Sequence, residues 1–263
     1  MKKKVTIAIF IAFLCVFIYA FFNLFTYSVE SISSGNETRQ LKKILQDIPK
    51  KEQTKSNETI TSIADPISGN SAESIPDDTE EAFSFEVLYQ INPDFVFWIN
   101  IPDTKIDNPV VYRDNEYYLS HSFYKKNNGH GCIFLDEACN KDDGFLVLHG
   151  HHMKDGSMFT GLDKFKNDKF RKGHIRITIT TAEGPVLYDV FAGMLADQTV
   201  EDPFDYTTKP SGDTWDTYFS CVKQNAFFFT ETPKQEDNLL ILSTCSYGTK
   251  DQRLVIFAKK EAE

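Results

Sequence analysis

The stretch LLILSTC at Leu239–Cys245 is followed, after the polar loop SYGTKDQ, by RLVIFA at Arg253–Ala258. Apolar runs of this length, bounded by a polar segment, are typical of buried β-strands. Because the connection between them is short, we expect the two strands to be antiparallel neighbours in one sheet. Cys245 and Arg253 would then face each other at one end of that sheet.

Further strands are predicted upstream of this pair. Apolar and polar residues alternate in His174–Thr180, which is the pattern of a half-buried strand. Other strands are expected at Phe95–Ile101, Pro109–Tyr112, Cys132–Leu135, Phe145–His149 and Val186–Leu195, and helices at Phe83–Ile91, Met158–Phe165 and Thr214–Ala226. About eight short strands separated by turn residues predict a mainly β domain, either a barrel or a sandwich.

The N-terminus carries a long apolar segment, VTIAIFIAFLCVFIYAFFNLF at Val5–Phe25. As a helix it would extend about 32 Å, enough to cross a hydrocarbon core of about 30 Å. Lys2–Lys4 precede it, and basic residues favour the cytoplasmic side, so the C-terminal body is expected outside the cell. A cleaved signal peptide is the alternative, but its apolar run would be shorter and would end in small residues, which Tyr19–Phe22 are not.

The remaining chain divides into a polar segment and one folded domain. Residues from Ser31 to Glu80 are polar, with few large apolar side chains, and suggest a flexible spacer with at most a short helix around Leu41–Leu45. We therefore expect a cytoplasmic tail at 1–4, a transmembrane anchor at 5–25, an extracellular stalk at 26–80 and a folded domain at 81–263. The formal net charge of −10 argues against nucleic acid as a partner.

The cysteine and the arginine that end the two C-terminal strands form a possible reactive pair. A nearby guanidinium stabilises a thiolate and so activates the thiol of Cys245. The N–H groups of Arg253 could also hold a carbonyl oxygen that becomes an oxyanion. The plainer alternative is a buried cysteine beside a solvated surface arginine.

Three histidines follow another apolar strand, in His149-Gly150-His151-His152. Zinc usually needs a third protein ligand from a recognisable second motif, and we find neither HExxH nor CxxC. A single histidine that acts as general acid and base is the better interpretation, and Gly150 would let the backbone turn there. We expect no metal and no cofactor. His121, His130 and His174 lack such a setting and are expected to be surface or packing residues.

The other cysteines have simpler interpretations. Cys15 lies in the apolar N-terminal segment. Cys132 lies in a predicted strand and Cys221 in a predicted helix, and we expect each of them to act as a small buried hydrophobic residue. Two disulfides among the four cysteines after residue 25 are arithmetically possible in an extracellular domain. We have no account of Cys139, which lies in a loop.

A thiol, an imidazole and a guanidinium at strand ends suit acyl transfer, and together their motifs resemble those of class B sortases. The resemblance is carried by ILSTC at Ile241–Cys245, by GHHMKDGSMF at Gly150–Phe159, by Arg253 at the start of the last strand, and by a long helix-containing insert at Asp197–Asn238. It runs from about Phe83 to the C-terminus, roughly two-thirds of the chain.

The resemblance implies an eight-stranded barrel with added helices and a membrane-tethered cysteine transpeptidase of Gram-positive bacteria. Such enzymes cleave a C-terminal sorting motif in secreted proteins, form a thioester on the cysteine, and transfer the acyl group to an amine of the peptidoglycan precursor. By position, Cys245 is the nucleophile, His151 rather than His149 or His152 is the acid and base, and Arg253 stabilises the oxyanion.

The same resemblance implies that Ser243 and Thr244 line the substrate groove. His149 stands where an aromatic residue is common in the family, so its role stays open. Alternatives are a cysteine peptidase that ends in hydrolysis, a pilin-polymerising sortase, a tethered binding module with an inert Cys245, and a zinc hydrolase. The sorting motif, the accepting amine and the oligomeric state are not indicated by the sequence.

Overall fold

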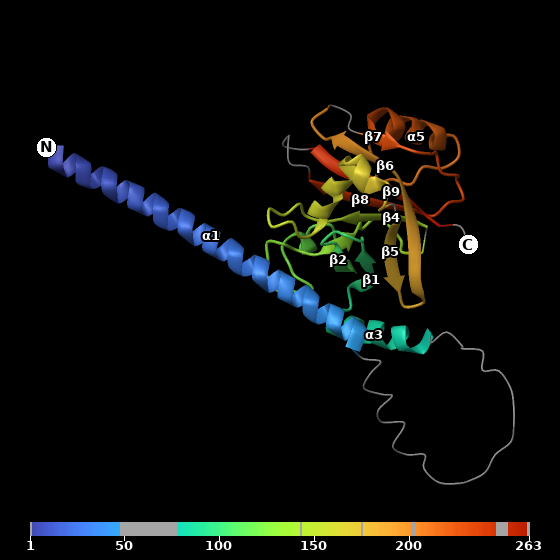
Figure 1. The fold of residues 1–263 in the computed structure, drawn as a ribbon, viewed down its shortest axis with the longest axis horizontal. Helices are drawn as coiled ribbons and strands as arrows, with labels where there is room; N and C mark the ends of the chain where they lie inside the picture. Colours follow the sequence, from blue (N-terminus) through green and yellow to red (C-terminus); the bar gives the residue numbers. More distant parts are fainter. Residues whose placement is uncertain are drawn as a thin grey trace, which may run out of the picture.

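The computed structural model describes residues 2–47, 78–142, 144–174, 176–200, 204–245 and 252–261. The helices are α1 (Lys2–Asp47), α3 (Asp78–Ile91), α4 (Asp168–Arg171) and α5 (Thr214–Asn225), with the 3-10 helices η1 (Tyr117–Leu119) and η2 (Phe159–Lys166). The strands are β1 (Phe95–Asn100), β2 (Asp107–Tyr112), β3 (Ile133–Leu135), β4 (Phe145–His149), β5 (Arg176–Thr181), β6 (Gly184–Asp197), β7 (Ala226–Phe229), β8 (Leu239–Cys245) and β9 (Gln252–Lys260). Figure 1 shows α1 projecting from a body made of these strands.

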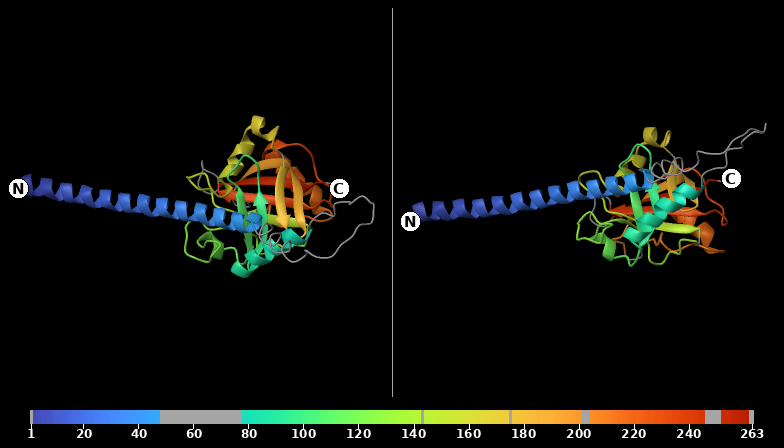
Figure 2. Two further views of the ribbon diagram at one scale, coloured as in Figure 1. Left: turned by 60° about the horizontal axis from the view of Figure 1, so that its bottom comes forward. Right: turned by 90° about the horizontal axis from the view of Figure 1, so that it is seen from below.

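The strands form a closed barrel. The hydrogen-bonded order is β5-β1-β2-β3-β4-β8-β9-β6-β7, and β5 also pairs with β6. This pairing closes eight of the strands on themselves, and β7 is added outside the ring along β6. The mainly β prediction and the eight-stranded barrel are therefore confirmed, and Figure 2 shows the barrel from two further directions.

The burial of the strands follows their sequence patterns. The apolar run of β8 is buried throughout, from Leu239 to Leu242, because one side faces the barrel interior and the other is covered. In β5 the alternation is also realised, since Ile177 and Ile179 are buried while Arg176 is exposed. These strands fill one continuous core with side chains from η2 and α5.

Three details of the secondary structure differ from the sequence prediction. The expected helix at 158–165 is the 3-10 helix η2, and the expected helix at 214–226 ends at Asn225. Strand β7, which starts at Ala226, was not predicted. Its four residues, AFFF, are all half-buried. They do not alternate between apolar and polar side chains, so the sequence lacks the alternation that indicates a half-buried strand.

Helix α1 is longer than the apolar segment that predicted it. It contains a stretch long and apolar enough to cross a membrane, and the large side chains there, such as Phe17 and Phe22, are exposed. The helix then continues through the polar residues 31–47, where a flexible spacer was expected. For this part of the stalk the structure differs from the prediction, while residues 48–77 lie outside the described residues.

The second half of α1 is ordered by the domain beneath it. Leu41 is 1% exposed and belongs to a second hydrophobic cluster with Phe85 of α3 and with Trp98 and Val111 of the barrel. Lys42 forms an ion pair with Asp107 of β2. A polar segment therefore folds as a helix because it has an apolar side chain and a basic side chain that match this surface.

Candidate active site

Two parallel strands, β4 and β8, bring the histidine and cysteine segments to the same end of the barrel. In their register His149 is paired with Ser243, and the amide of Gly150 donates to the carbonyl oxygen of Ser243 at 3.2 Å. His151 lies two residues beyond His149, and Cys245 lies two residues beyond Ser243. Both therefore start from neighbouring backbone positions at one end, or rim, of the barrel.

The cysteine strand is joined on its other side by β9. In this antiparallel pair the backbone of Cys245 lies opposite that of Arg253, as the sequence predicted. Cys245 is described as the last residue of β8, and Ser246–Asp251, the loop after it, lie outside the described residues. The backbone thus places the three residues at the ends of adjacent strands, in the order β4, β8, β9.

A cavity of about 450 Å³ opens at this rim. It is lined by Asn115, Leu119, Phe134, Asp136, His149, Gly150, His151, Gln198, Tyr206, Ser243, Thr244 and Arg253. Four residues singled out from the sequence, His151, Ser243, Thr244 and Arg253, therefore share one cavity. Its volume suits an extended segment of a few residues.

The ring of His151 is oriented by a backbone carbonyl. Its Nε2 lies 2.7 Å from the carbonyl oxygen of Leu119, on η1. A carbonyl oxygen only accepts, so Nε2 carries the hydrogen, and in the neutral ring Nδ1 is the basic atom. His151 is thus held half-exposed at the cavity, with Nε2 bonded to Leu119 and Nδ1 left as the acceptor atom of the neutral ring.

A second histidine in the cavity is held by a carboxylate. The Nε2 of His149 lies 2.8 Å from Oδ2 of Asp136, which also accepts from the side chain of Asn115 at 3.2 Å. Burial alone would raise the pKa of Asp136, but hydrogen bonds from His149 and from the amide of Ala138 outweigh it and hold the pKa below its ordinary value. Asp136 is therefore ionised at neutral pH, and His149 donates to it.

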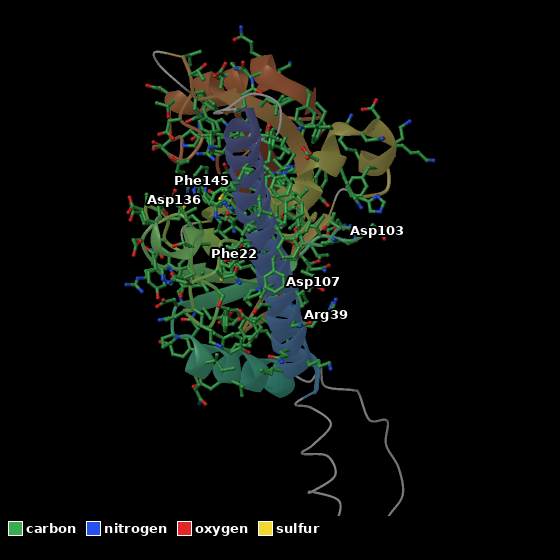
Figure 3. The ribbon with its side chains drawn as sticks, turned by 90° about the vertical axis from the view of Figure 1, so that its left-hand side faces the viewer. Phe22, Arg39, Asp103, Asp107, Asp136 and Phe145 are labelled. Atoms are coloured by element: carbon green, nitrogen blue, oxygen red, sulfur yellow. The ribbon has the colours of Figure 1, made fainter. Side chains whose placement is uncertain are left out.

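Sequence reasoning did not find Asp136 as a site residue. It follows β3 directly, and β3 pairs with β4, so Asp136 and His149 meet across a strand pair that the sequence does not reveal. A polar residue just after a short apolar strand was the available signal. In Figure 3 Asp136 is seen to one side of α1, while Asp103 lies to the other.

The two residues before Cys245 have different surroundings. The hydroxyl of Ser243 is hydrogen-bonded to that of Tyr206 at 2.8 Å, and Tyr206 is in turn held through its carbonyl oxygen by the hydroxyl of Tyr218 on α5. The hydroxyl of Thr244 is buried and has no hydrogen-bond partner among the described residues. An unsatisfied buried hydroxyl that lines a cavity is available to a ligand.

The remaining predicted features are apart from this cavity. Cys132 and Cys139 are buried in the two hydrophobic clusters, and Cys221 lies on α5. Burial raises the pKa of the Cys132 thiol, which keeps it protonated and unreactive. Among the described residues no three His, Cys, Asp or Glu side chains are grouped to hold a metal ion.

Comparison with known families accounts for this arrangement. A model of the Sortase domain matches residues 99–261, which include His151, Cys245 and Arg253. The chain belongs to the sortase family. The match begins within β1 and continues to the end of β9, so it covers the barrel and the whole rim described above.

Its similarity to class B sortases extends over most of the chain. It is 29% identical to sortase B of Listeria monocytogenes over 197 residues, which is 73% of this chain and 79% of that protein. It is 28% identical to sortase B of Staphylococcus aureus over 182 residues, 66% and 73% of the two chains. A crystal structure of a cysteine-to-serine mutant of Clostridium perfringens sortase B superposes with a TM-score of 0.66 at 28% identity, covering 70% of this chain and 90% of that one.

This chain is therefore a class B sortase, a cysteine transpeptidase. Sortases act on proteins that carry a sorting motif and transfer them to amines of the cell wall. The eight-stranded barrel and the cavity at one of its ends agree with that activity.

Proposed function

We propose that this sortase cleaves its substrate with Cys245 as the nucleophile, His151 as general acid and base, and Arg253 as the stabiliser of the oxyanion. The observation that carries the proposal is the register of three adjacent strands, which sets the backbone of Cys245 opposite Arg253 and one strand away from the end of β4. His151 and Arg253 also line the same cavity.

The acylation step follows from these positions. The Cys245 thiolate attacks the carbonyl carbon of the scissile peptide bond, and a carbon–sulfur bond forms. His151, which has taken the thiol proton on Nδ1, gives that proton to the departing amine as the carbon–nitrogen bond breaks. The N-terminal part of the substrate stays on Cys245 as a thioester.

The second step reverses these roles. An amine of the peptidoglycan precursor attacks the thioester carbon, and His151 accepts the proton that this amine loses. The carbon–sulfur bond breaks, the thiolate is regenerated, and a new amide is formed. In both steps the oxygen of the tetrahedral intermediate is negative, and the planar guanidinium of Arg253 offers it parallel N–H donors.

The residues before Cys245 are proposed to contact the substrate in two ways. The buried hydroxyl of Thr244 lacks a partner among the described residues, which supports a hydrogen bond from or to the bound peptide. Ser243 already bonds to Tyr206, so it is proposed to shape the groove together with that ring.

The enzyme is proposed to stay anchored in the cell membrane by residues 5–25, with residues 1–4 in the cytoplasm and the catalytic domain, from about residue 81, outside. Support comes from Lys2–Lys4 and from the length of the apolar helix. The unbroken continuation of α1 into the segment that packs on the domain favours retention of the helix over its removal as a signal peptide.

Attachment of proteins to the cell wall is proposed as the outcome, rather than pilin polymerisation or hydrolysis. The test uses the full chain, because Leu41 of α1 is part of a domain core. A peptide library identifies the cleaved motif, and mass spectrometry then compares the products with and without an added amine such as triglycine. An amide-exchanged product is expected; a product that is always the free acid would favour the peptidase.

A further inference from the structure

The loop that carries His151 is a closed turn with Asp155 at its tip. It leaves β4 at Gly150 and returns to η2 at Phe159, whose amide donates to the carbonyl oxygen of His151 at 2.9 Å. His152 and Met158 also form a β-bridge across its base. The closed loop therefore links Asp155 to the backbone of His151 over four positions of the chain.

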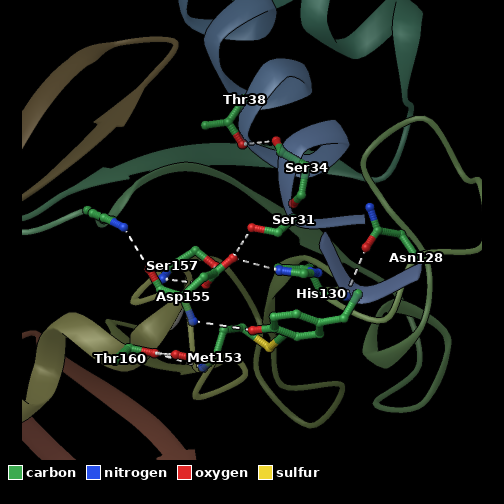
Figure 4. Close-up of polar contacts among 11 residues, drawn as sticks. Ser31, Ser34, Thr38, Asn128, His130, Met153, Asp155, Ser157 and Thr160 are labelled. Atoms are coloured by element: carbon green, nitrogen blue, oxygen red, sulfur yellow. Dashed lines mark hydrogen bonds and ion pairs between the residues drawn. The ribbon is translucent and has the colours of Figure 1, made fainter. Parts of the chain in front are cut away.

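The tip of this loop is bound to the helix that leaves the apolar segment. The carboxylate of Asp155 accepts a hydrogen bond from Ser31 of α1 and lies 2.9 Å from Nε2 of His130. The amide of Asp155 donates to the hydroxyl of Tyr27, also on α1, at 3.2 Å. Figure 4 shows these contacts converging on the loop, together with those from Ser157 to the same carboxylate.

The partner that completes the cluster is fully buried. His130 has no exposed surface, its ring packs against that of Tyr27 at 5.6 Å between centroids, and its amide donates to Asn128. The next residue, Gly131, has a φ of +60°, and a Cβ there would lie 2.2 Å from the carbonyl oxygen of Tyr118. The backbone that presents His130 to Asp155 is therefore fixed by its own turn.

The carboxylate at the centre is ionised. Burial would raise the pKa of Asp155, but hydrogen bonds from Ser157, Ser31 and His130 more than compensate and lower it. An acceptor that is charged binds its donors more strongly than a neutral one does. The hydrogen bond from Ser31 is thus made to a charged acceptor, while Tyr27 accepts from the backbone amide of the same residue.

The α1 residues that make these contacts come directly after the apolar segment. Tyr27 and Ser31 are about 3 Å and about 9 Å beyond Phe25 along the helix axis. They continue into one half-buried face of α1 at a spacing of three or four residues, through Ser34 and Thr38 to the buried Leu41. The part of the helix nearest the membrane is therefore the part that holds the histidine loop.

We propose that Tyr27 and Ser31 are positioning residues of this sortase: through Asp155 they connect the helix that emerges from the membrane to the loop of His151, so that turnover depends on how the anchor is seated on the domain. This inference rests on the role proposed above for His151. It adds that the anchor does more than tether, because it supplies two hydrogen bonds that set the acid–base group.

The test uses the full chain in lipid nanodiscs and a peptide found in the library screen. Tyr27→Phe combined with Ser31→Ala removes two hydroxyls, and kcat is expected to fall about 5- to 20-fold with KM within about twofold, because the loop is misplaced while the groove is intact. Ser31→Thr keeps a hydroxyl and is expected to retain most of kcat. Ser28→Ala is the matched control, since among the described residues its hydroxyl bonds only to the carbonyl oxygen of Leu24 in its own helix.

Hydrogen exchange supplies a readout that does not depend on catalysis. In the double variant the amide of Asp155 and its neighbours on the loop are expected to exchange at least about tenfold faster, because a protecting acceptor has been lost. A double variant with unchanged kcat and unchanged exchange, or a Ser28→Ala enzyme impaired to the same degree, would overturn the proposal. If His151→Gln keeps full turnover while the exchange still changes, the role of His151 is wrong and the helix contact stands.

Discussion

The backbone of Cys245, the last residue of β8, is paired with that of Arg253 in the neighbouring antiparallel strand β9. On the other side of β8, the parallel strand β4 ends at His149 opposite Ser243, two residues before Cys245. Three ends of adjacent strands thus form one rim, and the cavity there is lined by His151 and Arg253. The proposed mechanism needs these groups around one carbonyl carbon, and the strand order brings their backbones to one end of the barrel.

Replacement of Cys245 by alanine should abolish acyl transfer, because the thioester can no longer form. The unfolding free energy is expected to change by less than about 1 kcal/mol, since Cys245 is the last residue of β8. Product formation and urea denaturation measure the two effects. In the wild type, a mild thiol electrophile should modify Cys245 faster than Cys221 on α5; equal rates would count against an activated thiol.

Replacement of Arg253 by lysine keeps the charge and loses the planar pair of donors. We expect kcat to fall by about 100-fold or more, the size found when an oxyanion donor is removed, while KM changes little. Steady-state kinetics tests this, with Arg176→Lys as a control because Arg176 is exposed on β5, outside the cavity. A fully active Arg253→Lys enzyme would remove the role assigned to the guanidinium.

The two histidines of the cavity should differ in their effects. His151→Ala should lower kcat by about 10²- to 10⁴-fold through loss of the general acid and base. His149→Ala should cost far less, because the Nε2 of His149 is already bonded to Asp136. Kinetics of both variants side by side decides between them; if only His149→Ala stops turnover, the acid and base has been assigned to the wrong residue.

The pH dependence of stability should reveal the carboxylate beside His149. The folded protein lowers the pKa of Asp136 below its ordinary value of 3.8, so its contribution is present above that pH and is lost as the pH falls through the lowered value. Asp136→Asn should therefore destabilise the fold by about 1–3 kcal/mol at pH 7, with a smaller difference below pH 3.8. Urea denaturation from pH 7 to pH 3 measures this, with Asp142→Asn, at an exposed position, as the control variant.

The packing of α1 on the domain should be measurable through Leu41. Its side chain is 1% exposed, so Leu41→Ala should cost about 2–5 kcal/mol of unfolding free energy in the full chain. Ile32→Ala is the control, since Ile32 lies on the same helix and is 65% exposed. Equal stability of the two variants would show that α1 does not contribute to the domain core.

Much of the barrel was predictable because its signals are local. The apolar run of β8, the alternation in β5 and the turns between strands are properties of short segments, and the strands lie within a few residues of their predicted positions. The pairing of Cys245 with Arg253 was predictable as well, since a short loop between two strands permits almost no other arrangement.

Other features of the fold depend on contacts between segments that are far apart in the sequence. Residues 31–47 are polar, so a flexible spacer was expected, yet they are helical because Leu41 and Lys42 meet matching partners on α3 and β2. Strand β7 was not predicted for a similar reason, since its residues are defined as a strand by their pairing with β6.

By itself, the sequence determined the strands, the apolar helix and the residue types that perform acyl transfer, since each is encoded in periodicity or in a short motif. Only the tertiary structure decided that Asp136 binds His149, that Tyr206 binds Ser243 and that Ser31 binds Asp155, pairs separated by 13, 37 and 124 residues. The physical reason is that a hydrogen bond forms only between groups that lie within about 3 Å of each other. Strand order and helix docking bring these groups together, and neither strand order nor helix docking can be deduced from a short local segment of the chain.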